Sequence, residues 1–165
     1  MPEERSPTEE TPKEQRERTR HRGIGIGGAD ERKRILWVDS DPVMCAYAKA
    51  ILEPTYEVLL GWDGQSGLTL FRQRLPHLVV LNVVLSDMEW LDCSEKMVSS
   101  NPRVPIILTG RYIAFMSIDP MAALKAGVRN IVLNPLDAPH LLEEIAKRLE
   151  QAPFENEERF RHFSS

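Results

Sequence analysis

Five short apolar runs, separated by longer stretches with helix signals, constrain the fold of this chain more than any other feature. Each run is rich in Val, Ile and Leu, and most of them are continuous rather than alternating. Continuous apolar runs are typical of strands that are buried on both faces of a parallel sheet. The runs lie at 35–38, 56–60, 78–81, 104–108 and 130–133.

The stretches between the runs carry signals for helix starts, helix ends and amphipathic faces. Asp41 followed by Pro42 is typical of an N-cap and a first helical position. Gly127 follows an apolar stretch as a glycine does after the end of a helix. One apolar stripe near the end of the domain comprises Leu141, Leu142, Ile145, Ala146 and Leu149. Five strands alternating with five helices over residues 35–150 predict an α/β domain with a doubly wound parallel sheet.

The two ends of the chain differ in composition from this central domain. Residues 1–34 mix both signs of charge with almost no large apolar side chains, and a glycine run occupies 23–28. Such a segment cannot bury enough apolar surface to offset the entropy of ordering it, so we predict a disordered charged tail with a glycine-rich linker. Residues 151–165 are predicted to form a C-terminal tail that either docks on a partner or packs back onto the domain. Its apolar residues include Phe154, Phe160 and Phe163.

Composition excludes several classes of protein. There are 21 Lys and Arg against 25 Asp and Glu, for a net charge of −4, and no segment is strongly basic. The domain is therefore not expected to bind nucleic acid. Two cysteines, Cys45 and Cys93, are too few for a disulfide framework or a structural zinc site. Without a membrane-length apolar run or a secretory signal, we expect a soluble, cytoplasmic protein that binds no membrane.

Polar residues follow four of the five predicted strands. Asp39, with Ser40 and Asp41, follows the first strand, Asn82 the third, Thr109 the fourth and Asn134 the fifth. In an open parallel sheet, ligands bind beyond the carboxyl ends of the strands, at the point where the strand order reverses. The sequence therefore predicts one crevice lined by these side chains.

These features together resemble a response-regulator receiver domain, the phosphorylatable switch of bacterial two-component signalling. The resemblance implies a flavodoxin-like (βα)5 fold with strand order 2-1-3-4-5 over residues 35–150. The stretches that carry it are ILWVDSDP (35–42), YEVLLGWDGQSGL (56–68), HLVVLNVVLSDMEWLD (77–92), VPIILTG (104–110) and ALKAGVRNIVLNP (123–135).

The resemblance also implies which chemical groups this pocket has lost. The family holds Mg²⁺ with an acidic pair after the first strand, and here the second acid is Ser40. Its phosphoacceptor aspartate corresponds to Asn82, and its phosphate-binding lysine corresponds to Asn134. An amide is no nucleophile for phosphoryl transfer, and Mg²⁺ prefers anionic oxygen ligands. We therefore predict a degenerate phosphoacceptor pocket with no metal, cofactor or catalytic residue. The pocket comprises Asp39, Ser40, Asn82, Thr109 and Asn134.

Structural interpretations stand beside these functional ones. Asn82, Thr109 and Asn134 are expected to hydrogen-bond one another, because buried polar groups need partners. Trp90 stands where the family usually has glycine and is interpreted as local packing rather than a stacking platform. The family's Lys-Pro peptide bond is cis, and the resemblance implies the same for the bond before Pro135.

The stretch from Thr109 to Gly127 is longer than in typical members of the family and contains many large apolar side chains. They either cover the degenerate pocket or form an exposed docking patch. The family's usual interaction face corresponds to 111–150. The candidate partner-binding residues are Tyr112, Phe115, Met116, Ile118, Met121 and Ile131.

The leading hypothesis is a stand-alone pseudo-receiver that signals by protein–protein contact without phosphorylation. We expect its partner to be a kinase, a regulator or an output protein, and the chain to be a monomer or a weak homodimer. The alternative is a receiver switched by a small ligand or by phosphorylation at a non-standard residue, such as Asp39 or Asp87. An enzyme on the same fold is disfavoured, because no nucleophile–base pair is evident and the glycine run of 23–28 precedes a strand.

Overall fold

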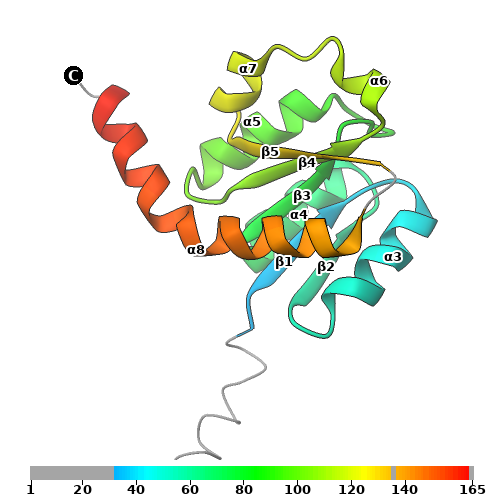
Figure 1. Cartoon of the computed structure of the whole chain (residues 1–165). Helices are drawn as coiled ribbons and strands as arrows, with labels where there is room; N and C mark the ends of the chain where they lie inside the picture. Colours follow the sequence, from blue (N-terminus) through cyan, green and yellow to red (C-terminus); the bar gives the residue numbers. More distant parts are fainter. Residues whose placement is uncertain (1–31, 135–136, 164–165) are drawn as a thin grey trace, which may run out of the picture. The chain divides into compact units, whose positions relative to one another are not determined.

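A parallel five-stranded sheet in the order β2-β1-β3-β4-β5 forms the centre of the domain (Figure 1). The computed structural model describes residues 32–134 and 137–163, and only the backbone from 152 onward. The strands are β1 (Arg34–Val38), β2 (Glu57–Gly61), β3 (Leu78–Asn82), β4 (Ile106–Gly110) and β5 (Val128–Leu133). This topology confirms the predicted flavodoxin-like doubly wound fold.

Helices cover both faces of the sheet. In one apolar cluster, side chains of α3 (Pro42–Leu52) and α8 (Ala138–Phe163) pack on residues such as Trp37, Val80 and Ile107. In the other cluster, α4 (Gly64–Arg74) and α5 (Trp90–Ser100) pack on the opposite face of the same strands. Strands buried on both sides need the continuous apolar runs that the sequence contains.

The connection between β4 and β5 differs from the prediction of one helix. It forms two short helices, α6 (Tyr112–Phe115) and α7 (Pro120–Lys125), so the described residues contain six helices rather than five. Asp119 and Pro120 supply an N-cap and a first helical position in the middle of this stretch, which starts a new helix there. The carboxylate of Asp119 accepts a hydrogen bond from Met121 N at 3.0 Å.

Other boundaries also differ from the sequence prediction. Strand β4 covers 106–110 rather than 104–108, so Thr109 lies inside the strand. Helix α8 continues past residue 150, where the sequence analysis placed the beginning of a tail. The predicted disordered segment lies, except for residues 32–34, outside the described residues, and so do the side chains of Phe154, Phe160 and Phe163. No helix in the described part of the chain is long and apolar enough to cross a lipid bilayer.

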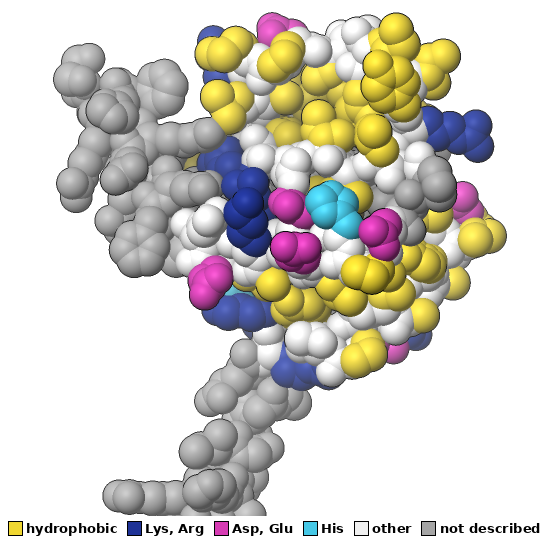
Figure 2. All heavy atoms as spheres, viewed as in Figure 1, with side chains coloured by type: hydrophobic (Ala, Val, Ile, Leu, Met, Phe, Trp, Pro, Cys, Tyr) yellow, Lys and Arg dark blue, Asp and Glu magenta, His cyan; other side chains and the backbone are white. Residues whose placement is uncertain are grey.

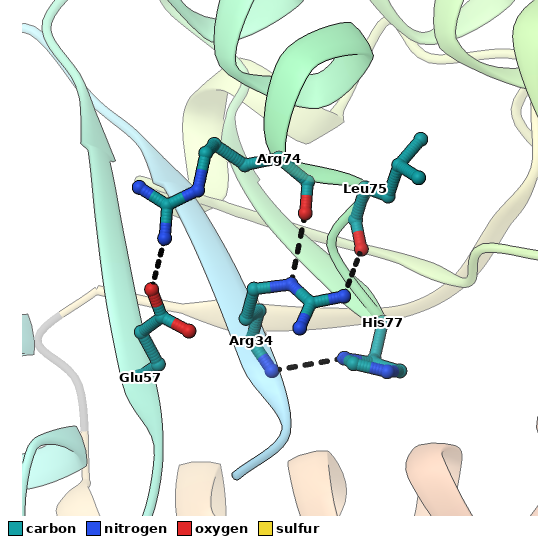
Figure 3. A network of polar contacts seen from close by, with 5 residues as sticks. All are labelled: Arg34, Glu57, Arg74, Leu75 and His77. Carbon is teal, nitrogen blue, oxygen red and sulfur yellow. Dashed lines mark hydrogen bonds and ion pairs between the residues drawn. The ribbon is translucent and has the colours of Figure 1, made fainter. Parts of the chain in front are cut away.

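A polar network holds the amino-terminal edge of the sheet to the end of α4 (Figure 3). The Arg34 guanidinium donates to the carbonyl oxygens of Arg74 at 2.8 Å and Leu75 at 3.1 Å, which α4 leaves unpaired at its C-terminus. The Arg34 backbone N–H donates to Nδ1 of His77 at 2.9 Å. Arg74 in turn forms an ion pair with Glu57 of β2.

This network predicts a loss of stability in mild acid. Partial burial, followed by the charges of Arg34 and Lys33, lowers the pKa of His77 below its usual value of 6.5. The unfolded chain therefore binds the proton more readily, so stability should decline as the pH falls through 6.5 toward the lower folded pKa. Protonated His77 also cannot accept the bond from Arg34.

The matched control is His77→Asn, because an asparagine side-chain oxygen can replace Nδ1 as the acceptor without titrating near neutral pH. Urea unfolding of both proteins measures the free energy of unfolding at each pH. Between pH 7 and pH 5 this free energy should decline in the wild type, and it should decline less in the variant. Parallel pH profiles would contradict the assignment of this decline to His77.

Candidate functional site

The strand register brings three of the predicted site residues to one edge of the sheet. Val38 pairs with Leu81 and Asn82 pairs with Thr109, so the carboxyl ends of β1, β3 and β4 lie side by side. Asp39 directly follows β1, and its backbone N–H donates to Gly61 O at 3.0 Å. Asp39 and Thr109 are buried, with exposed fractions of 3% and 1%. The predicted crevice residues Asp39, Asn82 and Thr109 therefore do lie together.

Hydrogen bonds occupy both oxygens of the Asp39 carboxylate. The backbone N–H of Asp41 donates to Oδ1 at 2.9 Å, and the Asn82 amide donates Nδ2–H to Oδ2 at 2.9 Å. The amide oxygen of Asn82 accepts from Val84 N at 2.8 Å. Asn82 thus links β1 to the loop after β3, because an amide can donate and accept at once.

Burial governs the electrostatics of this group. Desolvation raises the pKa of Asp39 above 3.8, against the hydrogen bonds from Asp41 and Asn82, which lower it. Beneath it, the Cys45 thiol donates to the carbonyl oxygen of Asp39 at 3.2 Å, and burial raises the pKa of Cys45 to about 11. Burial also raises the pKa of Cys93 to about 12, so both thiols are protonated at neutral pH.

Ser40 and Asp41 have other partners, and the buried side-chain oxygen of Asn134 has no hydrogen-bond partner among the described residues. Ser40 is exposed, and its hydroxyl bonds Ser86 at 3.3 Å, whereas Asp41 caps α3 by accepting from Val43 N at 2.9 Å, as predicted. Among the described residues, no hydrogen bond joins the side chains of Asn82, Thr109 and Asn134 to one another, so that expectation is wrong. Asn82 bonds the buried carboxylate instead, because a charged acceptor makes the stronger bond. The predicted cis bond at Pro135 lies outside the described residues.

Asp87 is a structural anchor that the sequence analysis did not identify. Its carboxylate accepts from Gly64 N at 2.7 Å and from Gln65 N at 2.9 Å, and so holds the loop after β3 against the N-terminus of α4. The position favours a carboxylate, because the first N–H groups of a helix lack partners and carry partial positive charge. Only the fold brings this loop to α4, so local sequence carries no signal for the contact.

Replacing Asp87 by alanine is expected to lower the free energy of unfolding by about 1–3 kcal/mol, because two charge-assisted hydrogen bonds are lost. Hydrogen exchange at the amides of Gly64 and Gln65 should also accelerate. Asp92→Ala is the matched control, since Asp92 is an exposed acid in the first turn of α5, and its loss should cost less than about 1 kcal/mol. Equal losses in the two variants would refute the anchoring role.

The donor set does not fit Mg²⁺, the metal that the family resemblance implies. The edge offers one carboxylate, Asp39, and both of its oxygens already accept hydrogen bonds. Asn82 donates a side-chain N–H to that carboxylate, and the side-chain oxygen of Asn82 accepts a hydrogen bond from Val84 N. Across residues 32–134 and 137–163, no group of three or more His, Cys, Asp or Glu side chains could hold a metal ion.

The candidate partner-binding residues divide into an exposed and an inward-facing set. Phe115 and Ile118 face inward and pack against the core, so they are not part of an exposed surface. The others are exposed, and Figure 2 shows hydrophobic side chains gathered over α6 and α7. The surface also includes Ile113, which is exposed. We call this set the α6–α7 apolar surface; it comprises Tyr112, Ile113, Met116, Met121, Leu124, Ile131 and Leu133.

Comparisons with known proteins agree with this fold. The response regulator receiver domain model matches residues 35–146, and the chain belongs to that family. It is 32% identical over 117 residues to the transcriptional regulatory protein ZraR of Salmonella typhimurium, covering 70% of this chain and 26% of that protein. It is 33% identical over 116 residues to the probable transcriptional regulatory protein TcrX of Mycobacterium tuberculosis, covering 70% of this chain and 47% of TcrX. The chain thus spans half or less of these curated relatives.

Among solved structures, the chain is similar to a CheY-like response regulator receiver domain protein from Methanospirillum hungatei. The two share 28% identity with a TM-score of 0.68, over 76% of this chain and 99% of that one. It is also similar to the signal receiver domain of an HD domain-containing protein from Pseudomonas fluorescens, at 25% identity and a TM-score of 0.65. That alignment covers 76% of this chain and 93% of the other.

Proposed function

We propose that this receiver is a degenerate one that signals without phosphorylation, by protein–protein contact in the cytoplasm. The observation that carries the proposal is Asn82 at the end of β3, with its amide donating to the Asp39 carboxylate. A receiver that accepts a phosphoryl group needs a free carboxylate nucleophile, and an amide does not provide one. A charge-assisted hydrogen bond keeps this amide in place in the resting domain.

The remaining acids near the edge support the same proposal. The two oxygens of Asp39 are hydrogen-bonded and the side chain is buried, so a phosphodonor would have to displace Asn82 to reach it. Both oxygens of Asp87 accept bonds from the N-terminus of α4. Attack by either acid would have to use an oxygen that already accepts a hydrogen bond.

A protein partner is supported by the α6–α7 apolar surface. Several large apolar side chains are exposed there on two short helices and on the edge strand β5. Exposed apolar side chains gathered in one region of a soluble domain support an interaction site. The methionines Met116 and Met121 suit contact with a partner, because their unbranched side chains adapt to different shapes.

Treatment with acetyl phosphate and Mg²⁺, followed by intact-mass spectrometry, tests the proposal. We expect no stoichiometric increase by the mass of one phosphoryl group. A stoichiometric adduct that is stable in acid and labile in base, mapped to Asp39 or Asp87, would instead support the receiver switched at a non-standard residue. Asp39→Asn and Asp87→Asn, assayed in parallel, would assign such an adduct.

A further inference from the structure

A cleft of about 500 Å³ opens beside the degenerate pocket. Its walls are the loop after β3, the first turn of α5, and the two short helices α6 and α7 with the residues between them. The cleft includes Val83 and Val84 from the first wall and Ala114, Ile118 and Ala122 from the last. This volume lies in the range that binds a small molecule or a few side chains of a partner.

The charged residues of the cleft all have the same sign. Glu89, Asp92 and Asp119 line it, and none of its described lining residues is Lys, Arg or His. Glu89 stands at the N-cap of α5 and makes no capping hydrogen bond, and Asp92 is in the first helical turn. Over the described ranges, neither acid forms an ion pair with a basic side chain. Their negative charge is therefore opposed only by the partial positive charge at the N-terminus of α5.

The apolar part of the cleft continues onto an exposed surface. Trp90 also lines the cleft, with the small part of its side chain that is exposed, 9%. Met121, which is next to Ala122 of the cleft wall, is exposed, and so are Tyr112 on α6 and Met116, which caps its C-terminus. A ligand in the cleft that also covers these side chains must combine positive charge with apolar groups.

We propose that this cleft binds a basic side chain, arginine in particular, from an amphipathic segment of a partner protein. The guanidinium would lie between Glu89 and Asp92, and apolar residues on either side of it would cover the α6–α7 apolar surface. Arginine suits the site because its planar group carries several N–H donors that can pair with two carboxylates at once. The inference rests on the proposed function, and it names the chemistry of the partner.

The probe is the peptide acetyl-Leu-Arg-Leu-Leu-amide, and its comparator carries citrulline, an uncharged isostere, in place of arginine. Each is titrated into the full chain labelled with ¹⁵N. The indole N–H of Trp90 and the amides of 117–119, 121 and 122 should shift saturably, while the indole signals of Trp37 and Trp62 serve as internal references. Citrulline should weaken binding about tenfold, since partly desolvated charge pairs contribute at that scale.

The variant Glu89→Gln/Asp92→Asn should bind both peptides with the weak affinity that the wild type has for the citrulline peptide. Glu95→Gln is the matched control, because Glu95 lies on the same helix, is exposed and does not line the cleft. It should retain the preference for arginine. These exposed, isosteric substitutions keep the fold, which thermal unfolding checks.

Three outcomes would overturn the proposal. They are equal binding of the two peptides to the wild type, shifts that map outside the cleft, and no saturable shift with either peptide. Agmatine binding as tightly as the arginine peptide would also overturn it, and would assign the cleft to small organic cations. None of these results depends on phosphorylation, whereas a stoichiometric phosphoryl adduct would contradict the proposed function without changing any of these binding results.

Discussion

Replacing Asn82 by aspartate is expected to lower the free energy of unfolding at pH 7 by about 2–4 kcal/mol. The substitution removes the donor that now lies 2.9 Å from Asp39 Oδ2 and puts a second carboxylate in its place. Two carboxylates at this distance disfavour each other's ionised form. Burial of Asp39 disfavours its ionised form further. The domain should therefore tolerate poorly the acid that its relatives need at this position.

Urea unfolding at several pH values measures this effect. The loss of unfolding free energy should shrink as the pH falls from 7 toward 4, because the two carboxylates of the variant then share a proton. Their pKa values are raised in the folded state above the unfolded values, and such a shift favours folding in acid. Millimolar Mg²⁺ should restore stability to Asn82→Asp, which has two anionic ligands, and leave the wild type unchanged.

Asn82→Ala is the control for the carboxylate itself. It removes the hydrogen bonds to Asp39 and Val84 without adding charge, so it should lack the Mg²⁺ response. Its gain in relative stability on acidification should be smaller than that of the aspartate variant, because it comes only from the loss of the bond that lowers the pKa of Asp39. If the aspartate variant is as stable as the wild type without Mg²⁺, the Asn82–Asp39 bond is not what holds this edge together. Stabilisation of the wild type by Mg²⁺ would contradict the poor fit of its donor set.

Replacing Trp90 by alanine should lower the free energy of unfolding by about 3–5 kcal/mol, the range for truncating a large buried aromatic side chain. Trp90 is 9% exposed and belongs to the apolar cluster under α4 and α5. This burial agrees with its interpretation as a packing residue. The volume left behind would stay partly open, because the strands beneath it are held by the rest of the sheet.

Trp62→Ala provides the matched control, since Trp62 is 52% exposed and follows the edge strand β2. Its loss should cost less than about 1 kcal/mol. Chemical unfolding monitored by circular dichroism compares the two variants without relying on the fluorescence of the residues removed. Similar losses in both would mean that Trp90 contributes little to the core.

In the β4–β5 connection, the sequence predicts which residues are apolar but not which of them face solvent. The prediction that this stretch carries a docking surface named six residues as one group, and Phe115 and Ile118 are turned toward the core. Hydrophobicity alone does not tell inward from outward when a helix is only one turn long, because the 3.6-residue period needs several turns to be recognised.

Sequence by itself determined the parallel sheet, the order of its strands through the family resemblance, and the identities of the residues at the strand ends. Those features depend on local periodicity and on residue type, which can be read along the chain. Only the tertiary structure decided that the Asn82 amide bonds Asp39, that Asp87 anchors α4, and that an acidic cleft opens beside Trp90. These contacts join segments far apart in sequence, and their partners depend on how the packed core orients each side chain.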